Sequence, residues 1–198
     1  MSRLPTEDRQ RQIADAALRI IAEQGLRRFT TAAVAERVGL SEGAVFRHFP
    51  NKKAIVTAAI DRVEEILFAG APEPADDPLE RLGEFVRYRV EMLSAFPGIP
   101  RIVFSEELGH AAGAKGAAKV AELKLRSFEI VQRCLLEAHA RGMLRTDVPL
   151  EHAMLIVQGT LLALVFRDAT EDAAEARRRA DALWQTVARL LRPSSPED

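Results

Sequence analysis

The stretch "TTAAVAERVGLSEGAVFRHFPNK", Thr30 to Lys52, contains two short helical patterns separated by a glycine. The first pattern starts with a threonine that can cap a helix, and it ends at Gly39, a residue type that commonly follows a helix. The second pattern starts after Ser41, another capping residue, and a proline stops it. The stretch therefore predicts two short helices joined by a tight turn.

Helical periodicity continues through the rest of the chain. No run alternates apolar and polar residues as a half-buried strand would, so we expect an all-α fold. Asn51 can cap the helix that follows the opening stretch. The expected helices lie at about 7–24, 31–38, 42–48, 52–69, 79–95, 98–107, 117–141, 150–166 and 172–191.

A proline-rich and acidic stretch, "GAPEPADDP" at 70–78, is the best candidate for a linker. It divides the chain into a small head and a larger helical body. The predicted boundaries are a head at 1–53, a linking helix at 52–69, a body at 70–192 and a disordered tail at 193–198.

The charge of the chain is unevenly distributed. Residues 1–53 contain ten Lys or Arg and six Asp or Glu, a net charge of +4, whereas the remaining 18 basic and 23 acidic residues give −5. A basic head on an acidic body indicates that the head meets a polyanion. Chance is the alternative, because an excess of this size is not rare in a short segment.

The remaining composition favours a cytoplasmic protein outside the membrane. The single cysteine, Cys134, allows no disulfide within the chain, which suits a reducing compartment. The N-terminus lacks the apolar stretch of a secretory signal. The most apolar segment, 153–166, is shorter than the roughly 20 residues that a bilayer requires. We expect the helix containing it to be buried on nearly all sides.

Two short helices with a turn between them predict a helix-turn-helix, whose second helix enters the major groove of DNA. Gly43 then has two explanations, since a helix glycine costs about 1 kcal/mol. It lets the helix approach another surface closely, or it packs against the other helices of the motif. The residues expected to pack within the motif are Ala35, Gly39, Leu40, Val45, Phe46 and Phe49.

The segment 29–55 resembles the DNA-binding head of the tetracycline-repressor (TetR) family of bacterial transcription regulators, and the resemblance is strong over about 9–60. Residues that match the family pattern are Thr31, Ala35, Gly39, Ser41, Gly43, Ala44, Val45, His48, Phe49 and Lys52. The resemblance implies a ligand-responsive regulator, commonly a repressor. Such a protein binds a palindromic double-stranded DNA operator as a homodimer and is released by a small-molecule effector.

Roles at the DNA follow from this resemblance and from side-chain chemistry. We expect phosphate contacts from Thr31, His48, Lys52, Lys53 and Arg28. We expect base readout at Glu42, Gly43, Ala44 and Arg47: Arg47 can bind guanine, Glu42 can accept from cytosine, and the Ala44 methyl can touch thymine. Alternatively, Glu42 only complements a helix N-terminus and Arg47 only touches phosphate. An N-terminal arm with Arg3, Arg9 and Arg11 is a further candidate.

Phe46 departs from the family pattern, which usually has a tyrosine there. The tyrosine hydroxyl commonly donates to a DNA phosphate. We expect Phe46 to keep the packing of the ring and to lose about 1 kcal/mol of DNA affinity with the missing hydrogen bond.

The resemblance also implies a dimer built from helices 150–166 and 172–191, two pairs of which would form a four-helix bundle. The expected interface residues are Leu155, Leu162, Leu183, Trp184, Val187 and Leu191. The expected effector pocket contains Tyr88, Met92, Phe104, Phe128, Gln158 and Phe166, which mix apolar walls with a few polar groups. The alternative for both sets is a place in the core of the monomer.

Two alternative hypotheses assign the protein to other functional classes. Glu107 and His110 have the Glu-x-x-His spacing of di-iron bundles, but the sequence contains no second copy, so we expect neither an enzyme nor a cofactor. A regulatory metal site using Glu106 and His110 stays open. The other rival is a DNA-binding TetR-fold protein that acts on a protein partner, such as the cell-division machinery.

Overall fold

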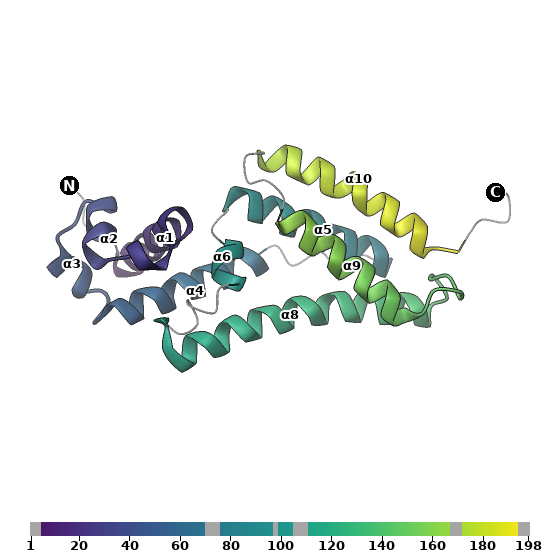
Figure 1. The fold of residues 1–198 in the computed structure, drawn as a ribbon, viewed down its shortest axis with the longest axis horizontal. Helices are drawn as coiled ribbons and strands as arrows, with labels where there is room; N and C mark the ends of the chain where they lie inside the picture. The colour runs from purple at the N-terminus through teal and green to yellow at the C-terminus, as the bar shows by residue number, and fades with distance from the viewer. Residues whose placement is uncertain (1–4, 70–75, 97–98, 105–110, 167–171, 194–198) are drawn as a thin grey trace. The chain divides into compact units, whose positions relative to one another are not determined.

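The computed structural model describes residues 5–69, 76–96, 99–104, 111–166 and 172–193, and all regular structure in these ranges is helical (Figure 1). The prediction of an all-α fold with about nine helices is confirmed. The elements are α1 (Thr6–Gln24), the 3-10 turn η1 (Leu26–Arg28), α2 (Thr31–Arg37), α3 (Glu42–Phe46), α4 (Lys52–Phe68), α5 (Pro78–Ala95), α6 (Ile99–Phe104), α8 (Gly113–Ala140), α9 (Leu150–Val165) and α10 (Ala173–Leu191).

Two helices differ most from the predicted bounds. α3 ends at Phe46, two residues early, and Arg47 caps it in a helical conformation. α8 begins at Gly113, before the predicted start at 117, and it contains Gly116. A helix-interior glycine costs about 1 kcal/mol, and this is not enough to end a long helix.

Side-chain caps start several helices where the sequence predicted them. The side-chain oxygens of Thr30, Ser41 and Asn51 accept hydrogen bonds from backbone N–H groups at the starts of α2, α3 and α4. Asp77 does the same for α5, accepting from the N–H of Leu79 at 2.7 Å. Each cap satisfies a backbone donor that the helix itself leaves open.

The contacts of the chain define two compact units, residues 1–68 with 96–124 and residues 69–95 with 125–198. We call them the N-terminal unit and the C-terminal unit. The predicted boundaries of head, linking helix and body stay a prediction. The predicted linker at 70–78 and tail at 193–198 lie mostly outside the described residues.

The N-terminal unit is built on the packing of α1 against α4. Ile13 and Ile20 of α1 are buried, as are Ile55 and Ile60 of α4. Arg62 of α4 adds an ion pair, at 2.7 Å, to Asp15 of α1. α2 packs against α1, and α3 packs against α2, so the helix-turn-helix segment is held on this pair of helices.

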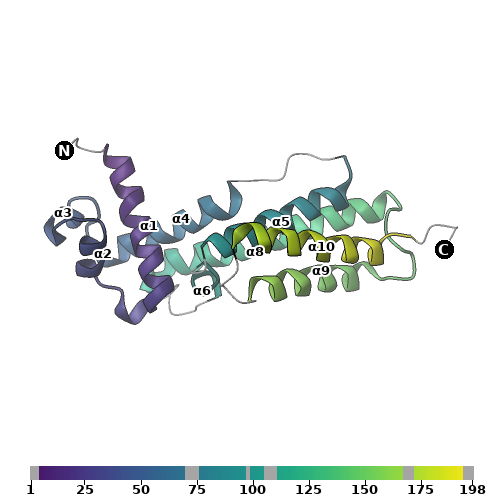
Figure 2. The same ribbon diagram turned by 90° about the horizontal axis from the view of Figure 1, so that it is seen from above.

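The C-terminal unit places α5, α9 and α10 side by side around one apolar core (Figures 1 and 2). Trp184 of α10 is its largest fully buried side chain. Gly83 of α5 makes room for that indole, because a Cβ at Gly83 would lie 2.2 Å from Nε1 of Trp184. No helix among the described residues is both long and apolar enough to cross a membrane.

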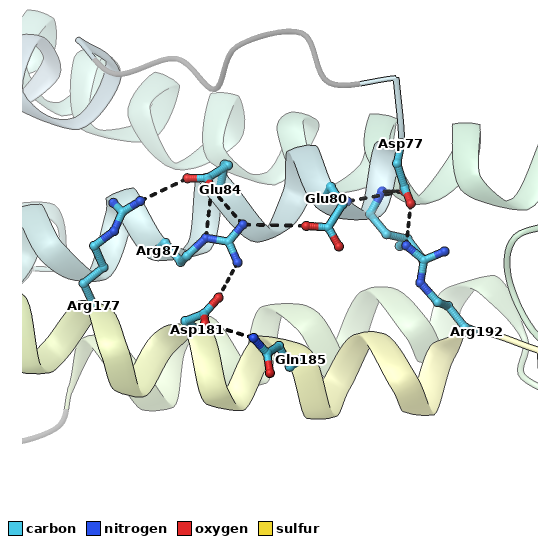
Figure 3. A network of polar contacts seen from close by, with 9 residues as sticks. Asp77, Glu80, Glu84, Arg87, Arg177, Asp181, Gln185 and Arg192 are labelled. Atoms are coloured by element: carbon cyan, nitrogen blue, oxygen red, sulfur yellow. Dashed lines mark hydrogen bonds and ion pairs between the residues drawn. The ribbon is translucent and has the colours of Figure 1, made fainter.

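A chain of polar contacts also joins α5 to α10 (Figure 3). Arg87 donates to Asp181 at 2.6 Å and to Glu84 at 2.9 Å. Arg177 reaches Glu84 at 3.2 Å, and Arg192 pairs with Asp77. These bonds lie at the edge of the apolar contact and fix the register of the two helices.

Candidate nucleic-acid interface

The turn between α2 and α3 is made by a glycine in the left-handed region. Gly39 has φ +66°, which a residue with a side chain adopts only with strain. Its N–H donates to the carbonyl of Glu36, and the N–H of Leu40 donates to that of Ala35 at 2.9 Å. This pair of bonds closes α2 in the way glycine-ended helices commonly do. The predicted helix-turn-helix is present.

The residues expected to pack within the motif divide into two groups. Ala35, Val45 and Phe49 are buried, as predicted. Leu40 is only half-buried. Phe46 is 45% exposed, so its predicted packing role is wrong. The reason is helical geometry, since Phe46 is turned by about 100° from the buried Val45.

The outward face of α3 consists of Glu42, Gly43, Phe46 and Arg47. Ala44 is buried at 8% exposure, so the expectation that it faces outward is wrong. Its methyl group closes the inner side of the helix next to Val45. The apolar group that α3 presents outward is therefore the phenyl ring of Phe46.

Gly43 has open space over it. A Cβ built at this position would meet no atom of the described chain within 4 Å. The explanation that Gly43 packs against the other helices of the motif is therefore wrong for the described residues. A close approach to a surface outside the chain is the explanation that remains.

The basic residues predicted to meet phosphate are accessible. Arg28, Lys52 and Lys53 are exposed, as is Arg47, and none of the four has an ion pair among the described residues. The Lys52 ammonium lies 5.2 Å from the ring centroid of Phe29, which steadies the side chain at the start of α4.

The other phosphate candidates are more enclosed. Thr31 is 8% exposed, which leaves its hydroxyl little open surface. His48 is half-buried, and its carbonyl accepts a hydrogen bond from Gln10 of α1 at 3.3 Å. The end of the Lys53 side chain lies against Gly113.

The first turn of α4 has an unusual charge for a helix N-terminus. It contains Lys52 and Lys53 and no acid. The positive end of the helix dipole disfavours cations there by typically 0.3–1 kcal/mol each. A bound anion would reverse this penalty, so the arrangement favours a phosphate at this position.

Arg37 is a positioning residue that the sequence did not single out. It binds Glu23 of α1 through two hydrogen bonds, at 2.8 and 2.7 Å. The hydrogen bond from Arg37 lowers the pKa of Glu23. This bidentate pair ties α2 to α1 and removes Arg37 from the set of available cations. The arm predicted at Arg9 and Arg11 is instead part of α1, and Arg3 lies outside the described residues.

A cleft of about 450 Å³ lies in the N-terminal unit between α1 and α4. The residues that line it include four acids, Glu7, Asp8, Asp61 and Glu65, and two arginines, Arg11 and Arg62. None of the residues predicted for the effector pocket lines it.

The predicted effector residues belong to different units. Phe104 lies in the N-terminal unit, and the other five lie in the C-terminal unit. Phe104, Phe128 and Phe166 are exposed, whereas Tyr88, Met92 and Gln158 are half-buried. Their role stays a prediction. Glu106, Glu107 and His110 lie outside the described residues, and the described ones contain no cluster of metal ligands.

The predicted dimer residues also divide. Trp184, Val187 and Leu191 are buried in the core of a single chain, which leaves them unavailable to a second one. Leu155, Leu162 and Leu183 are exposed. The expectation that α9 is buried on nearly all sides is wrong, because one of its faces lies on the core and the other is open.

Comparisons with known proteins agree with this geometry. Residues 13–59 match the model of bacterial regulatory proteins of the tetR family. The nucleoid occlusion factor SlmA of Haemophilus ducreyi (strain 35000HP / ATCC 700724) is 32% identical over 130 residues, which are 64% of this chain and 60% of that protein. SlmA of Vibrio campbellii (strain ATCC BAA-1116) is 28% identical over 186 residues, 91% of this chain and 89% of that protein.

Solved structures share the fold over nearly the whole chain. The TetR family transcriptional regulator PfmR from Thermus thermophilus is similar with a TM-score of 0.74 at 20% identity, covering 97% of this chain and 100% of that one. The ketosteroid transcriptional regulator KstR2 of Mycobacterium tuberculosis gives a TM-score of 0.75 at 17% identity, covering 94% and 96%. Residues 13–59 therefore match the tetR family of bacterial regulatory proteins, and the chain shares its fold with these two solved structures.

Proposed function

We propose that the protein is a transcriptional regulator that binds an inverted-repeat DNA operator as a dimer and is released by a small-molecule effector. The observation that carries the proposal is the outward face of α3. The matched segment 13–59 contains a helix-turn-helix whose second helix presents Gly43, Phe46 and Arg47 outward. Such a face suits a helix that enters the major groove.

Electrostatics support this assignment. Arg28, Arg47, Lys52 and Lys53 are exposed cations of the N-terminal unit without ion pairs among the described residues. Phosphate contacts of this kind supply much of the affinity of a DNA-binding protein and make it depend on salt. Binding should therefore weaken steeply as the salt concentration rises.

A dimer is supported by apolar residues that the single chain leaves exposed. Leu155 and Leu162 of α9 are seven residues apart, as are Leu183 and Leu190 of α10, so each pair lies on one face of its helix. Burial of such residues between two copies would remove their apolar surface from water. Two reading helices held by a two-fold axis would then bind two half-sites.

An effector site in the C-terminal unit is supported by Gln158 of α9. Its side-chain nitrogen is buried and has no hydrogen-bond partner among the described residues. A buried donor of this kind is costly unless an acceptor satisfies it, and a bound ligand can supply that acceptor. The effector would act by favouring a spacing of the two heads that differs from the DNA-bound spacing, and repression is the mode that we propose.

Selection from random duplex DNA tests this function. The purified protein is mixed with random sequences, and the retained DNA is sequenced. Enrichment of an inverted repeat is the expected result. If a folded dimer enriches no sequence at moderate salt, the proposed function is wrong.

A second candidate function is favoured by the SlmA relatives, which are named nucleoid occlusion factors. In this case the DNA-bound protein would act on the cell-division machinery rather than on a promoter. Mapping of bound sites on the genome separates the two functions. A few sites near promoters support the regulator, and many sites spread over the chromosome support the second candidate.

A further inference from the structure

Phe46 is an exposed aromatic side chain with no partner in the described chain. It and Phe104 are the large apolar residues exposed in the described part of the N-terminal unit. Phe104 has the ammonium of Lys124 over its ring, 5.5 Å from the centroid. The Phe46 ring has no such contact among the described residues, and its 45% exposure leaves a large apolar surface in water.

The position of Phe46 on α3 directs it toward the bases. Phe46 is the last residue of this five-residue helix and shares its outward face with Gly43, and no atom of its ring lies within 4 Å of a Cβ built at Gly43. The N-terminal half of a reading helix is the part that meets base edges. Because Gly43 has no side chain and nothing fills the space over it, the ring has room next to a base pair.

The chemistry of the major groove then limits what the ring can touch. Base-pair edges there present hydrogen-bond donors and acceptors, which a phenyl ring cannot satisfy. The C5-methyl group of thymine is the apolar group on these edges. Ala44, the residue predicted to contact this methyl group, is buried on the inner side of α3.

We propose that Phe46 is a specificity-determining residue that recognises thymine through its C5-methyl group at one position of each half-site. The inference rests on the proposed function, because it requires α3 to lie in the major groove. It goes further by naming the base and the atom that are read. Arg47, adjacent on the outward face, would supply the polar part of the readout.

Removal of the methyl group from the DNA tests the contact directly. Each thymine of the selected operator is replaced in turn by deoxyuridine, which pairs identically but lacks the methyl group. The wild-type protein should lose about fourfold in affinity at one position per half-site, as expected for the burial of one methyl group. Phe46→Ala should bind more weakly and show no further loss with deoxyuridine at that position.

Two controls make the result specific to the ring. Phe46→Tyr keeps the ring and should keep the deoxyuridine penalty. With wild-type protein, 5-methylcytosine at the same position should bind more tightly than cytosine, because it restores the methyl group. Equal urea midpoints for all three proteins exclude a folding defect.

The outcomes separate this inference from the proposed function. If an inverted repeat is enriched but deoxyuridine has no effect at any position, the thymine contact is wrong and the regulator stands. The same holds if the penalty persists in Phe46→Ala, since another group then reads the methyl. If the wild type enriches no sequence, both proposals are wrong.

Discussion

Gly43 and Gly83 both lie inside helices, and the structure explains them differently. Gly83 of α5 is required by the chain itself, because a Cβ there would overlap the buried indole of Trp184. Gly43 of α3 has no atom of the described chain within 4 Å of the corresponding position. Both residues incur the same loss of helix propensity, about 1 kcal/mol.

Gly83 is therefore a packing glycine, whereas the space over Gly43 is left open by the described chain. The contact between α5 and α10 is complete within one chain, with a buried tryptophan and a row of ion pairs. The outward face of α3 is incomplete, because it combines a bare glycine, an exposed phenyl ring and an exposed guanidinium. We propose that the outward face of α3 meets a partner outside the chain, and substitutions at Gly83 and Gly43 test this difference.

The largest effect is expected for Gly83→Ala. The added Cβ would lie 2.2 Å from Nε1 of Trp184, and the indole is 2% exposed with little room to move. Overpacking of this kind should destabilise the protein by about 3 kcal/mol. Urea unfolding followed by circular dichroism measures the change. An unchanged urea midpoint would show that Gly83 is not a packing glycine.

Gly43→Ala should have the opposite effect on stability. The new methyl group meets nothing, and alanine is the better helix former, so the free energy of unfolding should rise by up to about 1 kcal/mol. DNA affinity should fall by about tenfold or more, since the methyl group occupies the space of the approaching base pair. Urea unfolding and fluorescence anisotropy with the selected operator measure the two quantities.

The comparison fails if Gly43→Ala leaves DNA binding unchanged. The matched variant Thr57→Ala, at a half-buried position of α4, checks that a general change in helix stability does not alter affinity. It should leave operator binding as in the wild type.

The sequence was sufficient to predict the helices of the head but not the faces that they present. Caps and a left-handed glycine act over a few residues, so Thr30, Gly39, Ser41 and Asn51 could be assigned their roles in advance. α3 has only five residues, too few for periodicity to define its inner side. Ala44 was therefore predicted to face outward and Phe46 to pack inward, whereas the structure has the reverse.

Long-range packing was the other limit. The sequence analysis assigned Leu183, Trp184, Val187 and Leu191 of α10 to a dimer interface, but an apolar pattern does not state which neighbour covers it. Trp184, Val187 and Leu191 pack in the monomer, while Leu183 and Leu190 stay exposed. The contact of Gly83 with Trp184 shows that α5 covers this part of α10. These two residues are 101 positions apart in the sequence, so sequence patterns could not predict the contact.

The ion pair between Asp77 and Arg192 tests the contact between α5 and α10 through the pH dependence of stability. Burial raises the pKa of Asp77, but hydrogen bonds from Arg192 and from the N–H of Leu79 outweigh it, so the pKa lies below its ordinary value. The folded state therefore favours the carboxylate, and this stabilisation is lost as the pH falls through the lowered pKa. Asp77→Ala should cost about 1.5 kcal/mol near pH 7.

The stability difference between wild type and Asp77→Ala should stay constant above about pH 4 and shrink below it. Asp77→Asn is the matched variant, because it keeps a capping oxygen and removes the charge. It should recover most of the cap and none of the pH dependence. A difference that grows on acidification would contradict the assigned direction of the pKa shift.

The smallest effect is expected for Phe46→Tyr, on the outward face of α3. The exposed ring leaves space for a hydroxyl group, so the protein should fold with unchanged stability. If the new hydroxyl donates to a phosphate, operator affinity should rise by about fivefold, as for one added hydrogen bond of 1 kcal/mol. Because phosphates carry no sequence information, the gain should be equal for the operator and for point variants of it. A gain confined to one base position would instead place the hydroxyl at a base edge. A gain of either kind would show that the hydroxyl group of the new tyrosine contacts DNA. If affinity rises for no sequence, position 46 contacts DNA through the ring alone.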